Sequence, residues 1–533
     1  MPNAVVPAAL ISVDNKDGVT RLASALQAEG FRIVATTSTA AAIRAAGIRC
    51  DDVEQLTGFA SLCGGRVKTL HPKVFAGILA RSASAQDMQD LARLDVPAFS
   101  VVAVNLYAFE SAAKGDVDDP QITEQIDIGG VALLRAAAKN FCRVSVLSDP
   151  SQYEAFIERL HAGGTALEER RRLASEAFSL CQGYDAAIAS FLNADAAQTE
   201  AGVLGADGDL PDVIALNLAV RQRLGYGENP WARAAFYSAG KAENPCEQLA
   251  GRPLSYNNLL DLDSCLRLVA RVEEPLAFPA SAIPAAPVAA AIVKHTVPCG
   301  VAARQSSSQA LSAALGADPI SAFGGVVACG APLDEAAAQL LKPRFLDVVA
   351  APGYSSAALE ILRSKKNLRV LCFEAGLPAR LRRGEKVRSA LGGLLVEYPD
   401  EAAPADRWEI VSGSQPSGEQ WRDLLFAFAV VAQVKSNAAV VVRGQATLGI
   451  CAGQTNRVTA VALACTRAGD GVRGASLATD GFFPFADGLE AAANAGISAV
   501  VAPSGSIRDR EVIAAARAAG LSLVFASRRY FLH

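Results

Sequence analysis

Short apolar runs alternate with amphipathic segments through the first 150 residues of the chain. One amphipathic segment, from about Asp17 to Glu29, is followed by a glycine, which commonly ends a helix. Another begins at Thr36–Thr39, directly after an apolar run. Short buried strands that alternate with helices are typical of a parallel sheet covered on both faces. The runs that we expect to form its strands are Val5–Val13, Phe31–Ala35, Val101–Val104 and Val144–Leu147.

The pattern changes after this α/β part. Residues 151–195 favour helix, whereas residues 195–212 are small, polar and rich in glycine. A stretch of this composition is typical of a connection between domains. We therefore predict a first domain over 1–200, a linker over 201–212 and a second region over 213–533.

Apolar strands and alanine-rich helices alternate again in the second region. Two of its segments end in comparable ways, one in Lys294-His295 and the other in Lys435-Ser436-Asn437 ahead of another strand. This similarity suggests a duplicated α/β unit. The expected strands are Ala289–Val293, Val326–Ala328, Val370–Phe373, Ala438–Val442 and Ala499–Ala502.

Composition narrows the classes of protein to which the chain can belong. With 51% hydrophobic and 20% charged residues, it reads as globular rather than disordered. A net charge of −4 does not favour capture of nucleic acid or of an anionic membrane. The uncharged stretch Leu276–Val293 is interrupted by Pro279, Pro284 and Pro287, so we expect a connection followed by a strand rather than a membrane helix.

Cysteine and histidine usage points to the cytoplasm and away from a metal site. The eleven cysteines form no C-x-x-C pair and several lie in apolar runs, which favours reduced thiols. The four histidines show no ligand spacing, so we predict no metal. The N-terminus has no basic region before an apolar core, and we expect no signal peptide.

The most informative feature of the chain is the apolar run that stops at Lys294-His295, with Pro298 and Gly300 close behind. A buried strand delivers a cation and an imidazole to a loop at its end, which is where open α/β sheets place their chemistry. The alternative is a histidine bound to backbone beside a solvated lysine.

Three segments of the first part suit an anion or proton transfer. Gly65–Lys73 gathers three cations and a histidine between Gly and Pro, which suits an anion or forms a basic surface turn. The strand-to-helix turn Thr36–Thr39 offers free N–H groups to a phosphate or is an ordinary N-cap. Asp127 lies before a Gly pair with Lys139 downstream, which suits proton exchange or a structural ion pair.

Three further segments of the second part suit a flat, charged ligand. Ser321–Gly325 lets backbone approach a ligand. Asp480–Asp487 combines aromatic faces with carboxylates, or forms a core cluster at a turn. Gly449–Arg457 is a small-residue loop that ends in Gln and Arg. No P-loop and no G-x-G-x-x-G fingerprint is present, which argues against ATP or NAD chemistry. The residues alone indicate a two-part α/β enzyme with two anion-accepting sites.

Taken together and in order, the motifs resemble those of bifunctional purine-biosynthesis proteins, which join phosphoribosylaminoimidazolecarboxamide formyltransferase to IMP cyclohydrolase. The resemblance covers nearly the whole chain. Besides the KH…PCG and SAFGG segments and Arg529, the motifs are LTGF at Leu56–Phe59, GGRVKTLHPKV at Gly64–Val74, QIDIGG at Gln125–Gly130, RAAAKN at Arg135–Asn140, LSYNN at Leu254–Asn258, KSNA at Lys435–Ala438, FFPF at Phe482–Phe485 and PSGSIRD at Pro503–Asp509.

The resemblance implies a methylglyoxal-synthase-like cyclohydrolase domain followed by a duplicated cytidine-deaminase-like formyltransferase region without the deaminase zinc. It implies 10-formyltetrahydrofolate as formyl donor, a nucleotide substrate and a homodimer whose formyltransferase sites lie at the subunit interface. No nucleic acid or membrane partner is implied. The two activities would carry out the last two steps of IMP synthesis.

The resemblance also implies the roles of individual residues. For formyl transfer, His295 would be the base, Lys294 its charge partner and Asn437 the holder of the formyl oxygen. For ring closure, the active-site positions would be Lys68, Tyr107, Asp127 and Lys139. Residues that would bind the substrates are Lys16, Thr36, Thr39, Arg66, Thr69, Asn105, Tyr226, Asn258, Phe323, Gly324, Asp347, Arg457, Phe482, Asp487 and Arg529.

Several positions depart from the family's motifs, and they cluster at binding segments. Where an Arg would pair with the formyltransferase substrate's phosphate, the chain has Gly225. Losing one such pair costs roughly 1.5–3 kcal/mol. A carboxylate at Asp14 would repel a phosphate, and Thr37 cannot adopt the backbone angles open to a Gly. The other departures are Asn15, Ser38, Phe75, Ala108, Phe141, Trp231 and Ala232.

These departures leave two hypotheses for the function. Residues assigned to chemistry survive while several assigned to binding do not, which predicts a divergent enzyme with an altered nucleotide site. The alternative is a catalytically impaired paralogue that serves as a nucleotide-binding or partner subunit.

Overall fold

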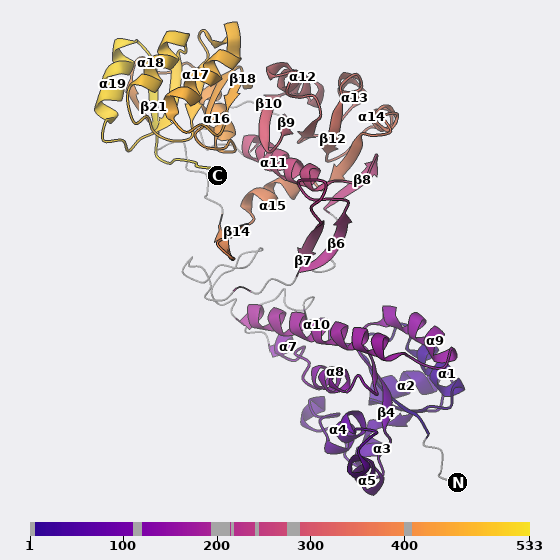
Figure 1. The fold of residues 1–533 in the computed structure, drawn as a ribbon. Helices are drawn as coiled ribbons and strands as arrows, with labels where there is room; N and C mark the ends of the chain where they lie inside the picture. Colours follow the sequence, from indigo (N-terminus) through magenta and orange to yellow (C-terminus); the bar gives the residue numbers. More distant parts are fainter. Residues whose placement is uncertain are drawn as a thin grey trace. The chain divides into compact units, whose positions relative to one another are not determined.

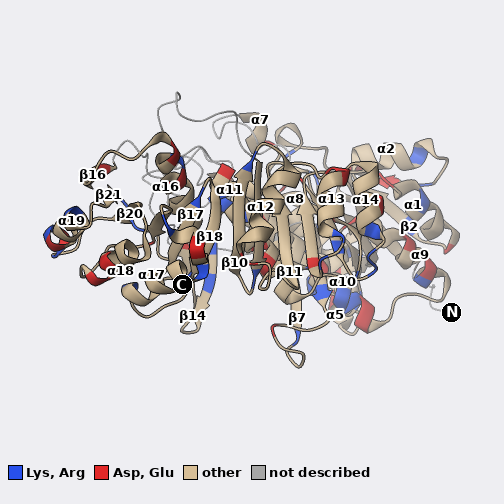
Figure 2. Cartoon of the chain, turned by 90° about the horizontal axis from the view of Figure 1, so that it is seen from above, with Lys and Arg blue, Asp and Glu red and all other residues tan. Residues whose placement is uncertain are grey.

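The computed structural model describes residues 6–109, 120–192, 214, 218–239, 245–273, 288–398 and 408–533. The chain divides into two compact units, Met1–Asn217 and Leu218–His533, which are described separately (Figure 1). The predicted linker over 201–212 and the three prolines before Val288 lie outside the described residues. Acidic and basic side chains are interspersed over the helices of both units (Figure 2).

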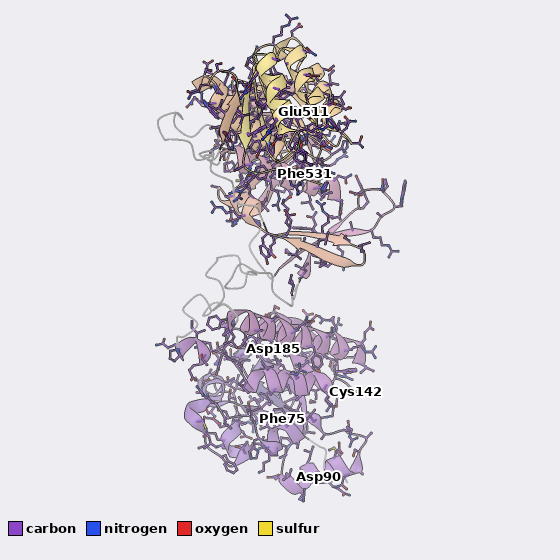
Figure 3. All side chains as sticks on the ribbon, turned by 90° about the vertical axis from the view of Figure 1, so that its left-hand side faces the viewer. Phe75, Asp90, Cys142, Asp185, Glu511 and Phe531 are labelled. Atoms are coloured by element: carbon purple, nitrogen blue, oxygen red, sulfur yellow. The ribbon has the colours of Figure 1, made fainter. Side chains whose placement is uncertain are left out.

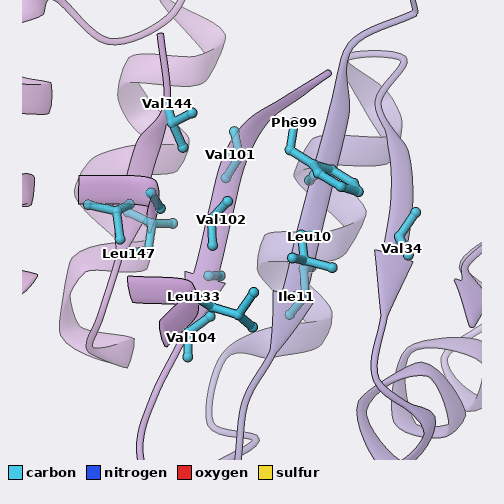
Figure 4. Packing of buried hydrophobic residues seen from close by; sticks show 14 of the residues in the cluster. Leu10, Ile11, Val34, Phe99, Val101, Val102, Val104, Leu133, Val144 and Leu147 are labelled. Atoms are coloured by element: carbon cyan, nitrogen blue, oxygen red, sulfur yellow. The ribbon is translucent and has the colours of Figure 1, made fainter. Parts of the chain in front are cut away.

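The first unit is built around a five-stranded sheet in the order β3-β2-β1-β4-β5, and all its strands are parallel. Apart from the edge strand Asp51–Asp52, apolar runs form these strands because they are buried under helices, as Leu10 and Phe99 of the strands and Leu133 of a covering helix show in Figure 4. The strands are β1 (Ala8–Ser12), β2 (Arg32–Ala35), β3 (Asp51–Asp52), β4 (Phe99–Val104) and β5 (Ser145–Leu147).

Helices connect the strands of the first unit and cover its sheet. The long helix α10 (Leu167–Leu192) packs against α8 (Gly129–Lys139) and β5. The remaining helices are α1 (Val19–Ala28), α2 (Thr37–Ala45), α3 (Val53–Thr57), α4 (Pro72–Leu79), α5 (Ala85–Leu94), α7 (Pro120–Thr123) and α9 (Tyr153–His161), with short 3-10 turns at Cys63–Gly65 and Pro150–Gln152.

The second unit holds a twelve-stranded sheet in the order β16-β21-β20-β19-β17-β18-β10-β9-β11-β12-β13-β8. Its strands are β8 (Cys246–Ala250), β9 (Val288–Lys294), β10 (Val297–Arg304), β11 (Gly325–Cys329), β12 (Leu346–Ala351), β13 (Arg369–Phe373), β16 (Glu409–Ser412), β17 (Ala439–Arg443), β18 (Ala446–Cys451), β19 (Ser476–Thr479), β20 (Ala499–Pro503) and β21 (Ser522–Ala526). Two separate hairpins accompany it, β6 (Leu218–Leu224) with β7 (Ala234–Ala239), and β14 (Lys386–Ala390) with β15 (Gly393–Glu397).

Helices and strands of the second unit repeat in the same order. The order α11-β9-β10-α12-β11-α13-β12-α14-β13 returns as α16-β17-β18-α17-β19-α18-β20-α19-β21, and the halves meet where β10 pairs antiparallel with β18. The helices are α11 (Tyr256–Glu273), α12 (Ser307–Ala317), α13 (Glu335–Leu341), α14 (Ser356–Arg363), α15 (Leu377–Arg383), α16 (Gly418–Val431), α17 (Arg457–Ala468), α18 (Asp487–Ala495) and α19 (Asp509–Ala518).

Equivalent contacts confirm that the second unit is duplicated. A Cβ at Gly300 would lie 2.0 Å from the Ala314 carbonyl oxygen, and one at Gly449 would lie 2.1 Å from that of Ala464. In each half, therefore, a glycine of the hairpin lets the following helix approach. The two segments compared in the sequence are not equivalent in the fold, since Lys294 ends β9 and His295 follows it, whereas Lys435–Asn437 precede β17. The equivalent of the Lys294–Thr296 turn is instead Arg443–Gln445.

Candidate active sites

A cavity of about 430 Å³ lies at the carboxyl ends of the first unit's parallel strands. Such a position follows from the fold, because loops that leave parallel strands on the same side converge there. Seven of the predicted site residues line it: Lys68, Tyr107 and Asp127, expected to act in ring closure, and Thr36, Arg66, Thr69 and Asn105, expected to bind substrate.

Asp127 is fixed at the start of α8 by its own backbone and side chain. Its Oδ1 accepts the Gly130 N–H at 2.7 Å, and its N–H donates to the Tyr184 hydroxyl at 2.9 Å. A Cβ at Gly130 would lie 2.3 Å from Asp127 Oδ2, which explains the glycine after this carboxylate. Burial raises the pKa of Asp127, more than the Gly130 hydrogen bond lowers it, so the carboxyl is poised to exchange a proton. Sequence reasoning missed Tyr184, 57 residues downstream.

Two basic side chains, Arg66 and Lys68, line the cavity from one loop, whereas Lys16 does not line it but is close enough to Lys68 to interact with its charge. Gly65 has a φ of +108°, and a Cβ there would lie 3.2 Å from Lys68 Cε, so glycine lets the lysine side chain pass. Lys16 donates to the carbonyls of Val13 and Asp14. Burial lowers the pKa of Lys16, the nearby Asp14 raises it, and Lys68 lowers it. These neighbouring positive charges suit an anionic ligand.

Several residues predicted to bind substrate make polar contacts within the protein. Arg66 forms an ion pair with Glu124 on the cavity wall, an acid that sequence reasoning missed. Asn105 Oδ1 accepts the Asp14 N–H at 2.5 Å and its amide donates to the Asn15 carbonyl at 2.8 Å. Thr39 is buried and its hydroxyl donates to the Val13 carbonyl at 3.1 Å, so it supports the strand end without lining the cavity.

The expected backbone conflict at Thr37 is wrong. Thr37 and Ser38 lie in the first turn of α2, and neither is among the residues with positive φ. A β-branched residue adopts these helical angles without penalty from the backbone, so the departure from glycine does not strain this turn. The Thr37 hydroxyl instead donates to Asp52 Oδ1 at 3.5 Å.

Lys139 does not join Lys68 and Asp127. It lines a separate, mostly apolar cavity of about 710 Å³ in the first unit, together with Phe75 and Phe141 (Phe75 is labelled in Figure 3). Two positions that depart from the family's histidines therefore meet around the same lysine. Arg171 lies over the Phe141 ring at 5.8 Å, which adds a cation to this wall.

In the second unit, the candidate residues gather at one end of the twelve-stranded sheet, here called the His295 end. It consists of the C-terminal ends of β9, β18 and β19 and the N-terminal ends of β10, β11, β12 and β17. The antiparallel pairs Lys294 with Val297 and Ala439 with Cys451 set this arrangement. Residues from loops far apart in sequence thus reach a common margin of the sheet.

Lys294 and His295 line a cavity of about 540 Å³ at this end, with Cys299, Asp318 and Arg467 on its walls. Lys294 Nζ donates to the Phe323 carbonyl at 2.7 Å, which joins the predicted SAFGG loop to the Lys294-His295 pair. Phe323 is 62% exposed and stacks on Phe345 with ring centroids 4.8 Å apart, leaving one aromatic face for a ligand.

Other predicted site residues occupy neighbouring positions at the His295 end and form a first group with Lys294, His295 and Phe323. Asn258 is buried and its amide donates to Asp347 Oδ2 at 3.5 Å. Gly324 has a φ of +75° and its N–H donates to the Phe345 carbonyl at 2.8 Å, so the loop turns tightly before β11. The structure therefore brings together Asn258, Lys294, His295, Phe323, Gly324 and Asp347.

A second group lines a different cavity of about 360 Å³, which contains Asn437, Arg457, Phe482 and Asp487. Arg457 is 4% exposed and forms an ion pair with the fully buried Asp480, which also accepts the Ala438 N–H at 2.9 Å. This pair holds the start of β17 in place, so Arg457 has a structural role beside its position on the wall. The Asn437 amide donates to the Gln454 carbonyl at 2.8 Å.

Arg529 lines a small cavity of about 170 Å³ with other cations that sequence reasoning missed. They are Arg267, Arg271, Arg382 and Lys386, and Glu397 is the acid among them. Arg271 is 4% exposed, lies 4.6 Å from the Tyr530 ring, and makes no hydrogen bond or ion pair within the described residues. A buried guanidinium without an acceptor is costly unless an anion joins it.

Tyr226 joins none of these cavities. It lies in the turn between β6 and β7 and is 42% exposed, and Trp231 in the same turn is 85% exposed. Gly225, where the family's motif has an Arg, precedes Tyr226 in this turn and has open space around its Cα.

Comparison with known proteins decides the family. A family model described as AICARFT/IMPCHase bienzyme matches residues 137–467, and one described as MGS-like domain matches residues 18–132. The bifunctional purine biosynthesis protein PurH of Desulfitobacterium hafniense (strain DSM 10664 / DCB-2) is 43% identical over 532 residues, covering 98% of this chain and 99% of the relative.

The chain belongs to the AICARFT/IMPCHase bienzyme family. A second relative, the PurH protein of Synechococcus elongatus, is 44% identical over 536 residues and covers 98% of this chain and 99% of its own length. A solved structure titled "Crystal structure of ForH" is 36% identical over 34% of this chain and 97% of that chain, with a TM-score of 0.32.

Membership confirms the resemblance and the predicted fold class. Like other AICARFT/IMPCHase bienzymes, the chain is a bifunctional enzyme of purine biosynthesis, with a formyltransferase and a cyclohydrolase activity. Among the described residues, no helix is long and apolar enough to cross a membrane, and no cluster of three metal-binding side chains occurs.

Proposed function

We propose that His295 is the base in formyl transfer from 10-formyltetrahydrofolate to 5-aminoimidazole-4-carboxamide ribonucleotide, with Lys294 beside it. The ring and the carboxamide withdraw the lone pair of the 5-amino group, so this amine attacks slowly unless its proton is removed. An imidazole is suited to that task near neutral pH. The observation that supports this role is the placement of both side chains on one cavity wall at the end of β9.

The step balances without an outside reagent. The amine nitrogen attacks the formyl carbon, and the bond from that carbon to the folate nitrogen breaks. His295 takes the amine proton and returns it to the departing folate nitrogen. Lys294 stabilises negative charge as it develops, and Asn437 holds the formyl oxygen as an oxyanion-hole donor. Because this is acid–base chemistry, we propose that neither activity requires a metal.

We propose that a homodimer completes both sites, because the candidate residues of each site are divided between separate cavities within one chain. Strands β10 and β18 separate β9 from β17, so His295 and Asn437 lie about 14 Å apart at a strand spacing of ~4.8 Å. They also line different cavities, as do Lys139 and Lys68. A second copy that places its own Asn437 and Lys139 against these walls would complete each site. None of the eleven cysteines of the chain forms a disulfide, which suits a reducing cytoplasm.

The Arg529 cavity is our candidate for the phosphate subsite of formyl transfer. A phosphate monoester would supply the acceptor that the buried Arg271 Nε lacks among the described residues, with Arg267 and Lys386 adding positive charge. This assignment explains how the chain holds a nucleotide although Gly225 replaces an arginine of the family's motif. The neighbouring rings of Tyr530 and Phe531 stack under Arg271 and Arg529 and orient their guanidinium groups.

For ring closure, we propose that Asp127 and Lys68 exchange protons with the formylated substrate while Tyr107 orients it. The carboxamide nitrogen attacks the formyl carbon, and the resulting carbinol loses water to give IMP. Asp127 is suited to receive and return a proton because burial raises its pKa toward the working pH. Lys16 and Thr36 would contact the phosphate.

Two assays on the purified protein test this function. The first follows formyl transfer to the carboxamide ribonucleotide, and the second follows ring closure of the formylated product. His295→Ala is expected to lower kcat of the first by about 100- to 10,000-fold and leave the second unchanged. Lys68→Met is expected to do the reverse. Absence of turnover in both assays with the unaltered protein would support the impaired paralogue instead.

A further inference from the structure

The turn that carries His295 has an unusual backbone. His295 has a φ of +56° and Thr296 a φ of +60°, so two consecutive non-glycine residues adopt the left-handed conformation. This conformation is disfavoured for ordinary side chains, and most of all for a β-branched residue such as Thr296. Something outside the turn must hold it.

Helix α11 supplies that support through Asp261. One carboxylate oxygen accepts the His295 N–H at 3.2 Å and the other accepts the Thr296 N–H at 2.6 Å. The Ser264 hydroxyl, one turn further along the helix, donates to the Thr296 carbonyl at 3.2 Å. The His295 ring itself has no hydrogen-bond partner among the described residues, so the backbone of the turn sets its direction.

The duplicated half repeats this arrangement with different residues in the turn. Asp423 of α16 accepts the Gly444 N–H at 2.9 Å and the Gln445 N–H at 2.6 Å, and both turn residues have positive φ. The preceding cation is also repeated: Lys294 donates to the Phe323 carbonyl, and Arg443 donates to the Arg473 carbonyl. Both halves therefore share one backbone arrangement, here called the frame: an aspartate of the preceding helix accepts both N–H groups of a left-handed turn.

The two turns differ in what occupies the first left-handed position. The second half has Gly444 there, which adopts this conformation freely, whereas the first half has the catalytic histidine. Since both halves share the frame, a residue that is energetically unfavourable at the first left-handed position occurs only in the half that holds the proposed catalytic pair. Backbone strain that persists at such a position is commonly part of a site's organisation.

We infer that Asp261 is a positioning residue for formyl transfer: by holding both amides of the His295-Thr296 turn, it aims the imidazole at the substrate amine. It does not touch substrate itself. The inference rests on the proposed role of His295 as base. Asp423 performs the same backbone task in the other half without a reacting group attached, and it is a matched control within the chain.

The test compares Asp261→Asn with Asp423→Asn in the full-length protein. Asparagine keeps one acceptor and loses the other, which releases one amide of each turn. Asp261→Asn is expected to lower kcat of formyl transfer about 10- to 100-fold, because a misplaced group loses rate rather than substrate affinity. The nucleotide and folate KM values and the ring-closure rate are expected to stay within about twofold of their original values.

A rescue variant separates positioning from general loss of structure. Thr296→Gly removes the strain at the second left-handed position, so adding it to Asp261→Asn is expected to recover most of the lost kcat. Asp423→Asn is expected to leave kcat of formyl transfer unchanged. If Asp261→Asn does not fold, Asp261→Glu keeps both acceptors, displaces the turn by one methylene and is expected to lower kcat in the same way.

Three results would overturn the inference: full kcat in Asp261→Asn, an equal loss of kcat in Asp423→Asn, or no recovery with Thr296→Gly. His295→Ala keeps these results apart from the proposed function. An active His295→Ala variant would refute the role of His295 itself. An inactive His295→Ala with a fully active Asp261→Asn would refute only the positioning role.

Discussion

Asp127 and Arg271 are single charged residues that the fold buries for opposite reasons. Asp127 accepts a backbone N–H and has no cation paired with it among the described contacts, so burial raises its pKa. Arg271 has no acceptor for its Nε among the described residues and lies against Tyr530. Neither arrangement favours stability, because an ionised group out of water needs a partner. Each is therefore better explained by a ligand than by folding.

Because the pKa of Asp127 is raised, removal of its carboxyl is expected to lower the activity without lowering the stability at high pH. Because the folded-state pKa exceeds the usual 3.8, the carboxyl's contribution to stability is present at low pH and is lost as pH rises through the raised value. Asp127→Asn is thus expected to lower kcat of ring closure about 100- to 10,000-fold while stability at pH 8 is unchanged or increased. Urea unfolding at pH 4 and pH 8 measures the stability; a variant less stable at pH 8 would contradict the assignment.

Arg271 is expected to determine how tightly the nucleotide binds in formyl transfer. Arg271→Met removes the guanidinium and keeps an apolar side chain, so the nucleotide KM of formyl transfer is expected to rise about 10- to 100-fold. The melting temperature should not fall, since the replaced cation has no ion pair within the described part of the chain. Gly225→Arg is expected to lower the same KM, alone or with Arg271→Met. Steady-state kinetics check both, and an unchanged KM in Arg271→Met would move the phosphate elsewhere.

Within the elements, duplication sets the close approach of helix to sheet. In both halves the helix after the hairpin lies so near its strand that a Cβ would contact a helix carbonyl oxygen, at 2.0 Å for Gly300 and 2.1 Å for Gly449. Gly316 lies inside α12 with no atom within 4 Å of the built Cβ. Replacement of glycine by alanine is therefore expected to have different consequences at Gly300 and at Gly316.

Alanine substitutions test this difference. Gly300→Ala and Gly449→Ala are each expected to reduce the free energy of unfolding by about 1–3 kcal/mol or more, because helix and strand must move apart. Gly316→Ala is expected to increase it by about 0.5–1 kcal/mol, because glycine is a poor helix former. Chemical denaturation of the three variants measures these changes. Unequal behaviour of the first two would argue that the halves are less alike in packing than their contacts indicate.

Across the whole molecule, the fold divides the eleven thiols into distinct classes. Cys63 and Cys142 are exposed, and Cys142 lies at the margin of the first unit in Figure 3. The other nine are buried or partly buried. Burial raises the pKa of Cys50, Cys299 and Cys465 to about 11 and that of Cys246 and Cys329 to about 12.

Thiol titration is therefore expected to proceed in two phases. At pH 8 an aromatic disulfide reagent should react quickly with Cys63 and Cys142 and slowly with the rest, because a thiol reacts as its thiolate and needs access. The remaining thiols should become reactive on unfolding in guanidinium chloride. A Cys63→Ser, Cys142→Ser variant serves as control, and a fast phase that persists in it would contradict the burial of the others.

Local patterns carried a large share of the candidate site. Asp127 before its glycine pair suggested proton exchange or a structural ion pair, and the structure places this carboxylate on a cavity wall, where its Oδ1 accepts the Gly130 N–H. The stop of an apolar run at Lys294-His295 indicated a strand end with polar groups, and both residues line a cavity there. Such features are local because they follow from the residues adjacent in the chain.

Partners that are distant in sequence could not be inferred in this way. Glu124 lies 58 residues from Arg66, and Asp261 lies 34 residues from His295, so neither pairing leaves a periodic signal. The separation of Lys139 from Lys68, and of Asn437 from His295, depends on which loops meet at which sheet end. Sequence order says nothing about these distances.

The sequence by itself determined the family, the α/β alternation and the residue types of both sites, because strand and helix periodicity and contiguous motifs are local properties of the chain. Only the tertiary structure decided that the second unit's halves share one frame around Asp261 and Asp423, and that the buried Arg271 Nε has no acceptor among the residues the structure describes. These depend on burial and on contacts between distant segments, which exist only once the chain has folded.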